Sequence, residues 1–212
     1  DSIAACQTGA RPGQCTLISF ACIPMNFDRV RHGWRGVLFN LLKQPERALQ
    51  AYRDSYRADP GHVGTLRMLG WMEAQREQWA EAVSWFEKAV EIEADDANTW
   101  FNLGYALDKG GMDDAAIAAM QRATELNPNN DRAWYGLGML HARQGRHRDA
   151  AAALTEAGRL QPMNGLTWCA LGMAWQHCNE PDKVAAVIEH TLTHDPQTAQ
   201  RLIRETGRSD YA

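Results

Sequence analysis

Hydrophobic positions in this 212-residue chain recur at the three- and four-residue spacing of amphipathic helices, and the whole pattern repeats every 34 residues. Each repeat is long enough for two helices and the turn that joins them. A fixed period of this length indicates one structural unit repeated along the chain, so the sequence predicts an all-α solenoid. Taken from the period, the units are 29–62, 63–96, 97–130, 131–164 and 165–198.

Three groups of recurring residues mark the register of these units. Leucine followed by glycine occurs at Leu69, Leu103, Leu137 and Leu171. Tryptophan occurs at Trp100, Trp134 and Trp168, and proline at Pro128, Pro162 and Pro196. Proline pushes the residue before it out of the α region, so we expect the second helix of most units to end just before it.

Small residues inside the predicted helices need a compensating contact, because glycine in a helix interior costs about 1 kcal/mol relative to alanine. We expect the two helices of a unit to approach closely at the glycines, with alanine as the partner on the second helix. Those alanines are Ala48, Ala82, Ala116 and Ala150. The large residues expected to fill the seam with the following unit are Tyr52, Phe86, Met120, Leu154 and Ile188.

The segment from Asp95 to Asn130 carries these residues in one uninterrupted unit and resembles a tetratricopeptide repeat. The resemblance extends over most of the chain. It implies a right-handed superhelical solenoid of about five helix-turn-helix repeats, with a concave groove lined by the first helix of each repeat. In this family the groove usually binds a peptide or a partner protein.

The pattern is weakest at the two ends of the chain. The first unit has His32 and Arg35 where large apolar residues are expected, and the fifth has Val184 and Thr191 in place of alanine, so we expect looser packing there. Terminal repeats are usually atypical because one face meets water. The segment 197–206, followed by Gly207, predicts a C-terminal cap helix. The predicted organisation is a non-repeat extension (1–28), five repeats (29–198), and a cap helix with a tail (199–212).

The resemblance also implies which side chains face the groove, because each position in a repeat has a fixed orientation. The predicted partner-binding residues are Arg67, Trp71, Asn98, Phe101, Asn102, Tyr105, Arg132, Tyr135, Met139 and Met173. The aromatic and methionine side chains among them make this face more apolar than a solvated surface, and aromatic residues often anchor binding. The alternative is that some of these rings pack against neighbouring hairpins as part of the core.

A subset of the family grips the C-terminal carboxylate of a partner peptide with five polar residues. Arg67, Asn102 and Arg132 occupy three of the corresponding positions in this chain, but Trp71 and Gly136 occupy the other two. The clamp is therefore incomplete, and the sequence argues against a co-chaperone that reads chaperone tails. The three polar residues remain candidates for holding a peptide backbone or an acidic side chain.

The extension before the repeats contains one largely apolar run, Leu17–Ile23. We hypothesise that this run lies along the solenoid, in the groove or against the first unit. Three cysteines also fall in the extension, at Cys6, Cys15 and Cys22, and they are free, bridged or modified. The residues before Cys6 resemble a bacterial lipobox without the apolar stretch that should precede it.

Composition limits the partners and the compartment. The net charge of −4 and the 23% of charged residues do not indicate a nucleic-acid binder. A mean hydropathy of −0.47 and the lack of a long apolar run predict no transmembrane segment. We expect no signal peptide, since the run at 17–23 is short and no strongly basic segment precedes it. The cytoplasm is slightly favoured over a periplasmic or lipid-anchored location.

Two clusters invite a chemical interpretation. His190 and His194 share one face of a predicted helix, and His177 and Cys178 end the helix before it. They are either part of a zinc site or surface residues of a terminal repeat. A basic run spans the turn of the fourth unit and is either a contact for an acidic partner or a solvated turn; it comprises His141, Arg143, Arg146, His147 and Arg148.

No nucleophile elbow, metalloprotease helix, phosphate loop or dinucleotide fingerprint is present in the sequence. We therefore expect neither an enzyme nor a cofactor, but a scaffold that binds another protein or peptide and belongs to a larger complex. The alternative function is a structural subunit, docked through the convex face and the N-terminal extension.

Overall fold

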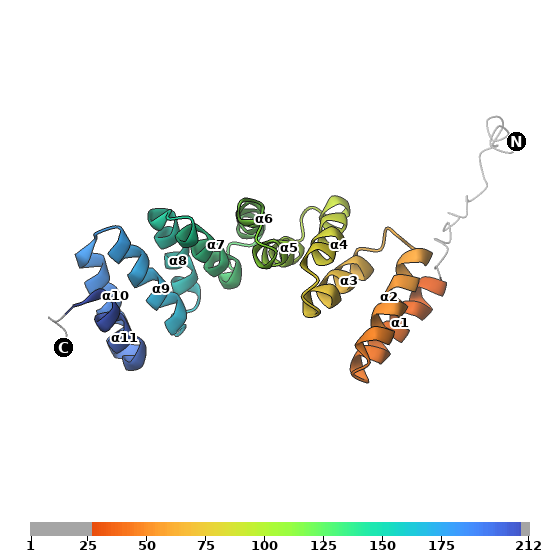
Figure 1. The fold of residues 1–212 in the computed structure, drawn as a ribbon, viewed down its shortest axis with the longest axis horizontal. Coiled ribbons are helices and arrows are strands. Elements are labelled where there is room, and N and C mark those ends of the chain that lie inside the picture. Colours follow the sequence, from red (N-terminus) through yellow and green to blue (C-terminus); the bar gives the residue numbers. More distant parts are fainter. Residues whose placement is uncertain (1–26, 209–212) are drawn as a thin grey trace, which may run out of the picture.

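The computed structural model describes residues 27–208, and this part of the chain folds into α-helices without a strand. Figure 1 shows the helices as successive pairs that follow one another in a row from α1 to α11. The helices are α1 (Phe27–Leu41), α2 (Pro45–Ala58), α3 (Val63–Gln75), α4 (Trp79–Ile92), α5 (Ala97–Lys109), α6 (Asp113–Leu126), α7 (Asp131–Arg143), α8 (His147–Leu160), α9 (Gly165–His177), α10 (Pro181–His194) and α11 (Pro196–Thr206). The predicted all-α fold of successive helix pairs is confirmed for these residues.

From α1 to α10, each odd-numbered helix packs against the even-numbered helix that follows it. Each even-numbered helix also packs against the next helix along the chain, and α11 packs against both α9 and α10. The first helices also contact one another, α3 with α5, α5 with α7, and α7 with α9. They form a continuous layer along one side of the solenoid. The predicted N-terminal extension, residues 1–28, lies almost wholly outside the described residues. The apolar run 17–23 and the cysteines at 6, 15 and 22 lie outside them as well.

The recurring glycines accommodate a different partner from the one we expected. A Cβ atom on Gly70 would lie 2.8 Å from the ring of Phe86, and one on Gly138 would lie 2.6 Å from Leu154. The large side chain of the second helix therefore seats on the glycine of its own unit. Phe86 and Leu154 also belong to buried clusters that contain Leu103 and Leu171 of the following units, as expected for residues that fill the seam. Met120 likewise approaches the Cβ positions of Gly104 and of Gly136 in the following unit.

Two further repeated features fix how each first helix begins. The indole nitrogens of the repeated tryptophans donate hydrogen bonds to the carbonyl oxygen six residues earlier, at 2.8 to 2.9 Å. The side chain just before the helix accepts a hydrogen bond from a backbone N–H of the first turn, which satisfies one of its free donors. These capping residues are His62, Asp96, Asn130 and Asn164.

The C-terminal end is closed by a third helix. Leu202 on α11 is buried, and a Cβ atom on Gly172 would lie 2.6 Å from its side chain. In earlier units, a residue of the second helix packs on the corresponding glycine. Val184 and Thr191 are also buried, and the Thr191 hydroxyl donates to the backbone oxygens of its own helix. The expectation of loose packing at these residues is wrong, because α11 covers this end. The helix stops at Gly207, whose φ of 66° suits glycine.

Within residues 27–208, no helix has the length and apolar character needed to span a membrane.

Candidate partner-binding groove

Four first helices present one large apolar side chain each at the same position of the repeat. These residues are Val37, Trp71, Tyr105 and Met139, spaced by 34 residues, and each side chain is 42% to 43% exposed. We call this set the ladder. Its members lie on α1, α3, α5 and α7. The helices α3, α5 and α7 contact one another in sequence, so Trp71, Tyr105 and Met139 run along that layer.

The central member of the ladder is held in place by its neighbours. The ring of Tyr105 meets the ring of Trp79 edge-to-face, with centroids 6.1 Å apart. The ammonium group of Lys109 lies 5.6 Å from the centroid of Tyr105. An aromatic side chain fixed in this way loses little freedom when it binds a ligand, which makes Tyr105 a suitable anchor.

The other predicted apolar groove residues are placed differently. Phe101 is half-buried and packs against the central core, while Tyr135 and Met173 pack against the C-terminal core. Their exposed edges still adjoin the layer of first helices. The structure therefore separates the predicted apolar set into an exposed ladder and a supporting group that shares in the core.

Arg67 is engaged within the scaffold. Its guanidinium contacts the Asp96 carboxylate at 2.5 Å and lies 3.9 Å from Glu93. Burial opposes ionisation of Asp96, but hydrogen bonds from Thr99 and Arg67 outweigh it and hold the pKa of Asp96 below its usual value. Because Asp96 caps α5, Arg67 joins α3 to the start of the next repeat, and little of it remains for a ligand.

Polar groups remain available further along the groove. Arg132 and Asn98 are exposed and Asn102 is half-buried. In the part of the chain that the structure describes, the side chains of these three residues make no hydrogen bond or ion pair. They are therefore the predicted polar residues that are free to meet a ligand.

The basic run of the fourth unit is exposed at Arg143, Arg146 and Arg148, but two of its members are engaged within the scaffold. His141 is buried, and its pKa is lowered by burial and by the charge of Arg146. The Arg143 guanidinium lies between Asp108 and Asp113 of the preceding unit, with its Nε 2.9 Å from the Asp113 carboxylate. These hydrogen bonds raise the pKa of Arg143. Of the two alternatives for this run, a contact for an acidic partner or a solvated turn, neither is tested for Arg146 and Arg148, while Arg143 forms an ion-pair bridge between two units.

The histidines at the C-terminal end stack on other rings. His190 lies between Trp168 and His194, with centroids 4.0 Å and 4.6 Å away. His177 stacks at 4.4 Å on His147, which begins α8. No group of three metal-ligating side chains is found among residues 27–208.

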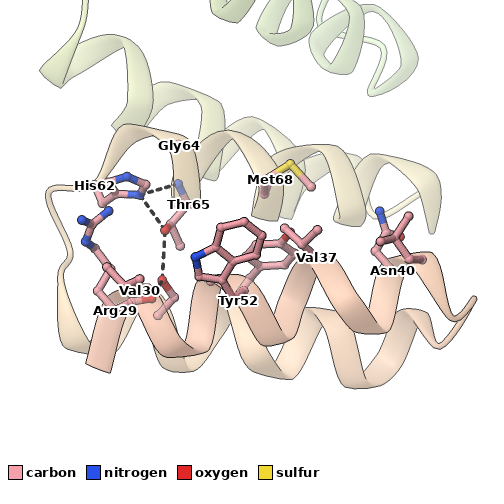
Figure 2. A pocket seen from close by; sticks show the side chains of 13 residues that line it. Arg29, Val30, Val37, Asn40, Tyr52, His62, Gly64, Thr65 and Met68 are labelled. Carbon is pink, nitrogen blue, oxygen red and sulfur yellow. Dashed lines mark hydrogen bonds between the residues drawn. The ribbon is translucent and has the colours of Figure 1, made fainter. Parts of the chain in front are cut away.

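A pocket of about 500 Å³ opens between α1, α2 and α3, at the end of the described solenoid where the first helices are less closely packed. Figure 2 shows His62 and Thr65 at one end of this pocket and Val37 and Asn40 towards the other. Sequence reasoning missed it, because the first unit departs from the repeat pattern. The available signal was the number of apolar residues between Trp34 and Leu42 that the pattern does not assign to the core.

Comparison with known proteins agrees with this description. The family described as "Tetratricopeptide repeat" matches residues 101–163, and the one described as "TPR repeat" matches residues 70–111. No curated protein sequence matches the chain.

Solved structures share the fold over most of its length. A crystal structure of MamA aligns with a TM-score of 0.74 and 23% identity, covering 89% of this chain and 98% of that one. A second MamA structure gives 0.72 and 25%, with coverage of 78% and 96%. YrrB, described as a TPR protein with an unusual peptide-binding site, gives 0.73 and 22%, with coverage of 84% and 92%.

Proposed function

This chain is a tetratricopeptide repeat protein, and we propose that it is a non-catalytic scaffold that binds a segment of a partner protein along its first helices. The fold supports protein–protein interaction in general, since its repeats stack into an extended surface. The proposal concerns where this chain binds and through which side chains. Its role would be to hold components of a larger assembly together.

The observation that carries the proposal is the ladder. Core positions of the repeat are filled by other residues, such as Leu69, Leu103 and Leu137, all of which are buried. Trp71, Tyr105 and Met139 are therefore not needed to close the core, yet they remain large, apolar and partly exposed. Binding would remove their apolar surface from water, and aromatic residues of this kind usually dominate the energy of an interface.

The free polar groups indicate the chemistry of the partner. Arg132 and the amides of Asn98 and Asn102 offer hydrogen-bond donors beside the apolar ladder. A segment with apolar side chains at intervals, and with backbone carbonyls or a carboxylate between them, would satisfy both. YrrB, which shares the fold, is itself described as having a peptide-binding site.

The test uses the full chain and two matched variants. Trp71→Ala with Tyr105→Ala removes two members of the ladder, while Ile92→Ala removes an exposed apolar residue of similar accessibility from a second helix, α4. A photoreactive amino acid at Met139 first identifies the partner in cells of the source organism. We expect the double variant to lose at least about tenfold in affinity for that partner, equivalent to 1.4 kcal/mol, and Ile92→Ala to bind normally.

The alternative function, a subunit docked through its convex face, makes the opposite prediction for the same variants. Ile92 and Leu192 are exposed on second helices, which lie away from the ladder. If the ladder variant bound normally and Ile92→Ala bound weakly, the groove proposal would be wrong and the convex-face function would replace it.

A further inference from the structure

The pocket between α1, α2 and α3 exposes apolar side chains that the fold leaves uncovered. Trp34 is 71% exposed and Leu41 is 76% exposed, and both line the pocket with Val30, Val37 and Met68. A cluster of this kind marks an interaction surface. We propose that residues 17–23 of the same chain occupy this pocket and lie antiparallel to α1.

The chemistry of the segment matches that of the pocket. The run Leu-Ile-Ser-Phe-Ala-Cys-Ile at 17–23 is largely apolar, and no charged residue occurs between Arg11 and Asp28. An uncharged segment can enter an apolar pocket without desolvating a charge, which would be costly. In an extended chain, alternate side chains share a face, so Ile18, Phe20 and Cys22 would point together into the pocket.

The length of the segment also matches. Helix α1 has 15 residues, which corresponds to about 22 Å. Seven extended residues span about 23 Å, so the run 17–23 can cover α1 from one end to the other. Residues 24–26, which begin with Pro24, are enough to reverse the chain before α1 starts at Phe27.

A buried donor in the pocket points to a polar ligand atom as well. Tyr52 lines the pocket and is only 4% exposed, and within residues 27–208 its hydroxyl has no hydrogen-bond partner. A buried hydroxyl without a partner is unfavourable. Burial also raises the pKa of Tyr52, so the group stays protonated and can donate. A backbone carbonyl of an extended segment in the pocket would accept this hydrogen bond.

Three other polar side chains of the pocket already satisfy one another. The Ser55 hydroxyl lies 3.1 Å from the Thr65 hydroxyl, which lies 2.8 Å from Nδ1 of His62 (Figure 2). These three side chains need no ligand, and Arg29, which also lines the pocket, pairs with Asp59 at 3.3 Å. The apolar wall, Tyr52 and Asn40 therefore determine what binds. Occupation by residues 17–23 would cover Val37 and leave Trp71, Tyr105 and Met139 of the ladder open to a partner.

Disulfide trapping in the full-length chain tests this arrangement. Val30 lines the pocket, whereas Arg31 is its exposed neighbour and lies outside the lining. Val30→Cys should form an intramolecular bond with Cys22 under mild oxidation, located by peptide mapping, and the bond should disappear when Cys22→Ser is added. Arg31→Cys should react with Cys22 several-fold less. Equal reaction at both positions, or a bond between two chains, would overturn the proposal.

Hydrogen exchange of α1 provides a second, independent test. Phe20→Asp places a charge in the pocket, while Ser19→Asp places the same charge on the opposite face of the extended segment. We expect amides of residues 27–41 to exchange several-fold faster in Phe20→Asp and at the normal rate in Ser19→Asp. Normal exchange in Phe20→Asp, or equal acceleration in both, would show that the segment does not lie in the pocket in this way.

Discussion

The indole nitrogen of Trp134 donates a hydrogen bond to the carbonyl oxygen of Pro128, 2.9 Å away, across the turn that separates two repeats. The same bond joins Trp168 to Pro162 and Trp100 to the oxygen of Ala94. Proline is thus not required for the bond, since only the backbone oxygen takes part. The repeated tryptophan fixes the angle at which each new hairpin leaves the previous one.

Trp134→Phe should therefore destabilise the solenoid. The substitution keeps an aromatic ring against the core but removes the donor, and the cost should be about 1–2 kcal/mol. Denaturant unfolding of the full chain measures it. Trp71→Phe is the matched control, because among residues 27–208 the Trp71 indole makes no hydrogen bond. An equal loss of unfolding free energy in both variants would show that the hydrogen bond from Trp134 does not stabilise the solenoid.

Gly70→Ala should be destabilising even though alanine favours helices. Its Cβ would lie 2.8 Å from the ring of Phe86, which is buried and cannot move aside, and overpacking of this kind costs about 1–3 kcal/mol. A Cβ atom on Gly33 would make only an ordinary van der Waals contact, 3.9 Å from the Ser55 hydroxyl, so Gly33→Ala should gain up to about 1 kcal/mol. Thermal unfolding of the two variants should shift in opposite directions.

These contacts show which parts of the fold were predictable. The repeat period places every helix and turn of the middle units, because the glycines, tryptophans and prolines are local signals with a fixed spacing. The partner of Gly70 was not predictable in the same way. Whether Phe86 points towards its own hairpin or the next one depends on how two helices pack, and the period does not specify that.

The sequence also predicted part of the candidate site, namely which residues share a face. The position of Trp71, Tyr105 and Met139 in the repeat indicated a shared face, and their exposure is consistent with it. That Arg67 is bound by Asp96 was missed, because Asp96 lies 29 residues further along the chain, at the N-cap of the first helix of the next repeat. The pocket beside α1 was missed because a pattern describes what repeats, and the first unit departs from it.

Glu73→Gln should weaken the junction between the first two hairpins. The carboxylate of Glu73 is buried on α3, where it accepts hydrogen bonds from Arg53 of α2 at 2.8 Å and from Arg76 at 3.2 Å. Loss of its charge should cost about 1–3 kcal/mol, as expected for hydrogen bonds to a buried ionised group.

The matched control for this change is Glu125→Gln. Glu125 pairs with Arg122 on the surface of α6, where loss of the pair should cost less than about 1 kcal/mol. Urea unfolding monitored by circular dichroism distinguishes the two variants. If Glu73→Gln were no more harmful than the surface variant, the buried pair would not stabilise the junction.

The stability of the fold should decrease as the pH falls below the normal titration range of histidine, and His141 should be one cause. Burial lowers the pKa of His141 below 6.5, with the charge of Arg146 acting in the same direction and Asp149 opposing it. The unfolded chain then binds a proton near pH 6.5 that the folded chain binds less readily. The stabilisation is complete above this value and is lost as the pH falls towards the folded pKa.

His141→Gln should therefore flatten the pH dependence of unfolding. The free energy of unfolding, measured between about pH 7.5 and about pH 5.5, should fall less steeply in the variant than in the parent chain. Some slope should remain, because the pKa of His62 is also lowered, first by burial and then by Arg29. An unchanged slope in His141→Gln would mean that the buried imidazole takes up its proton as readily in the folded chain as in the unfolded one.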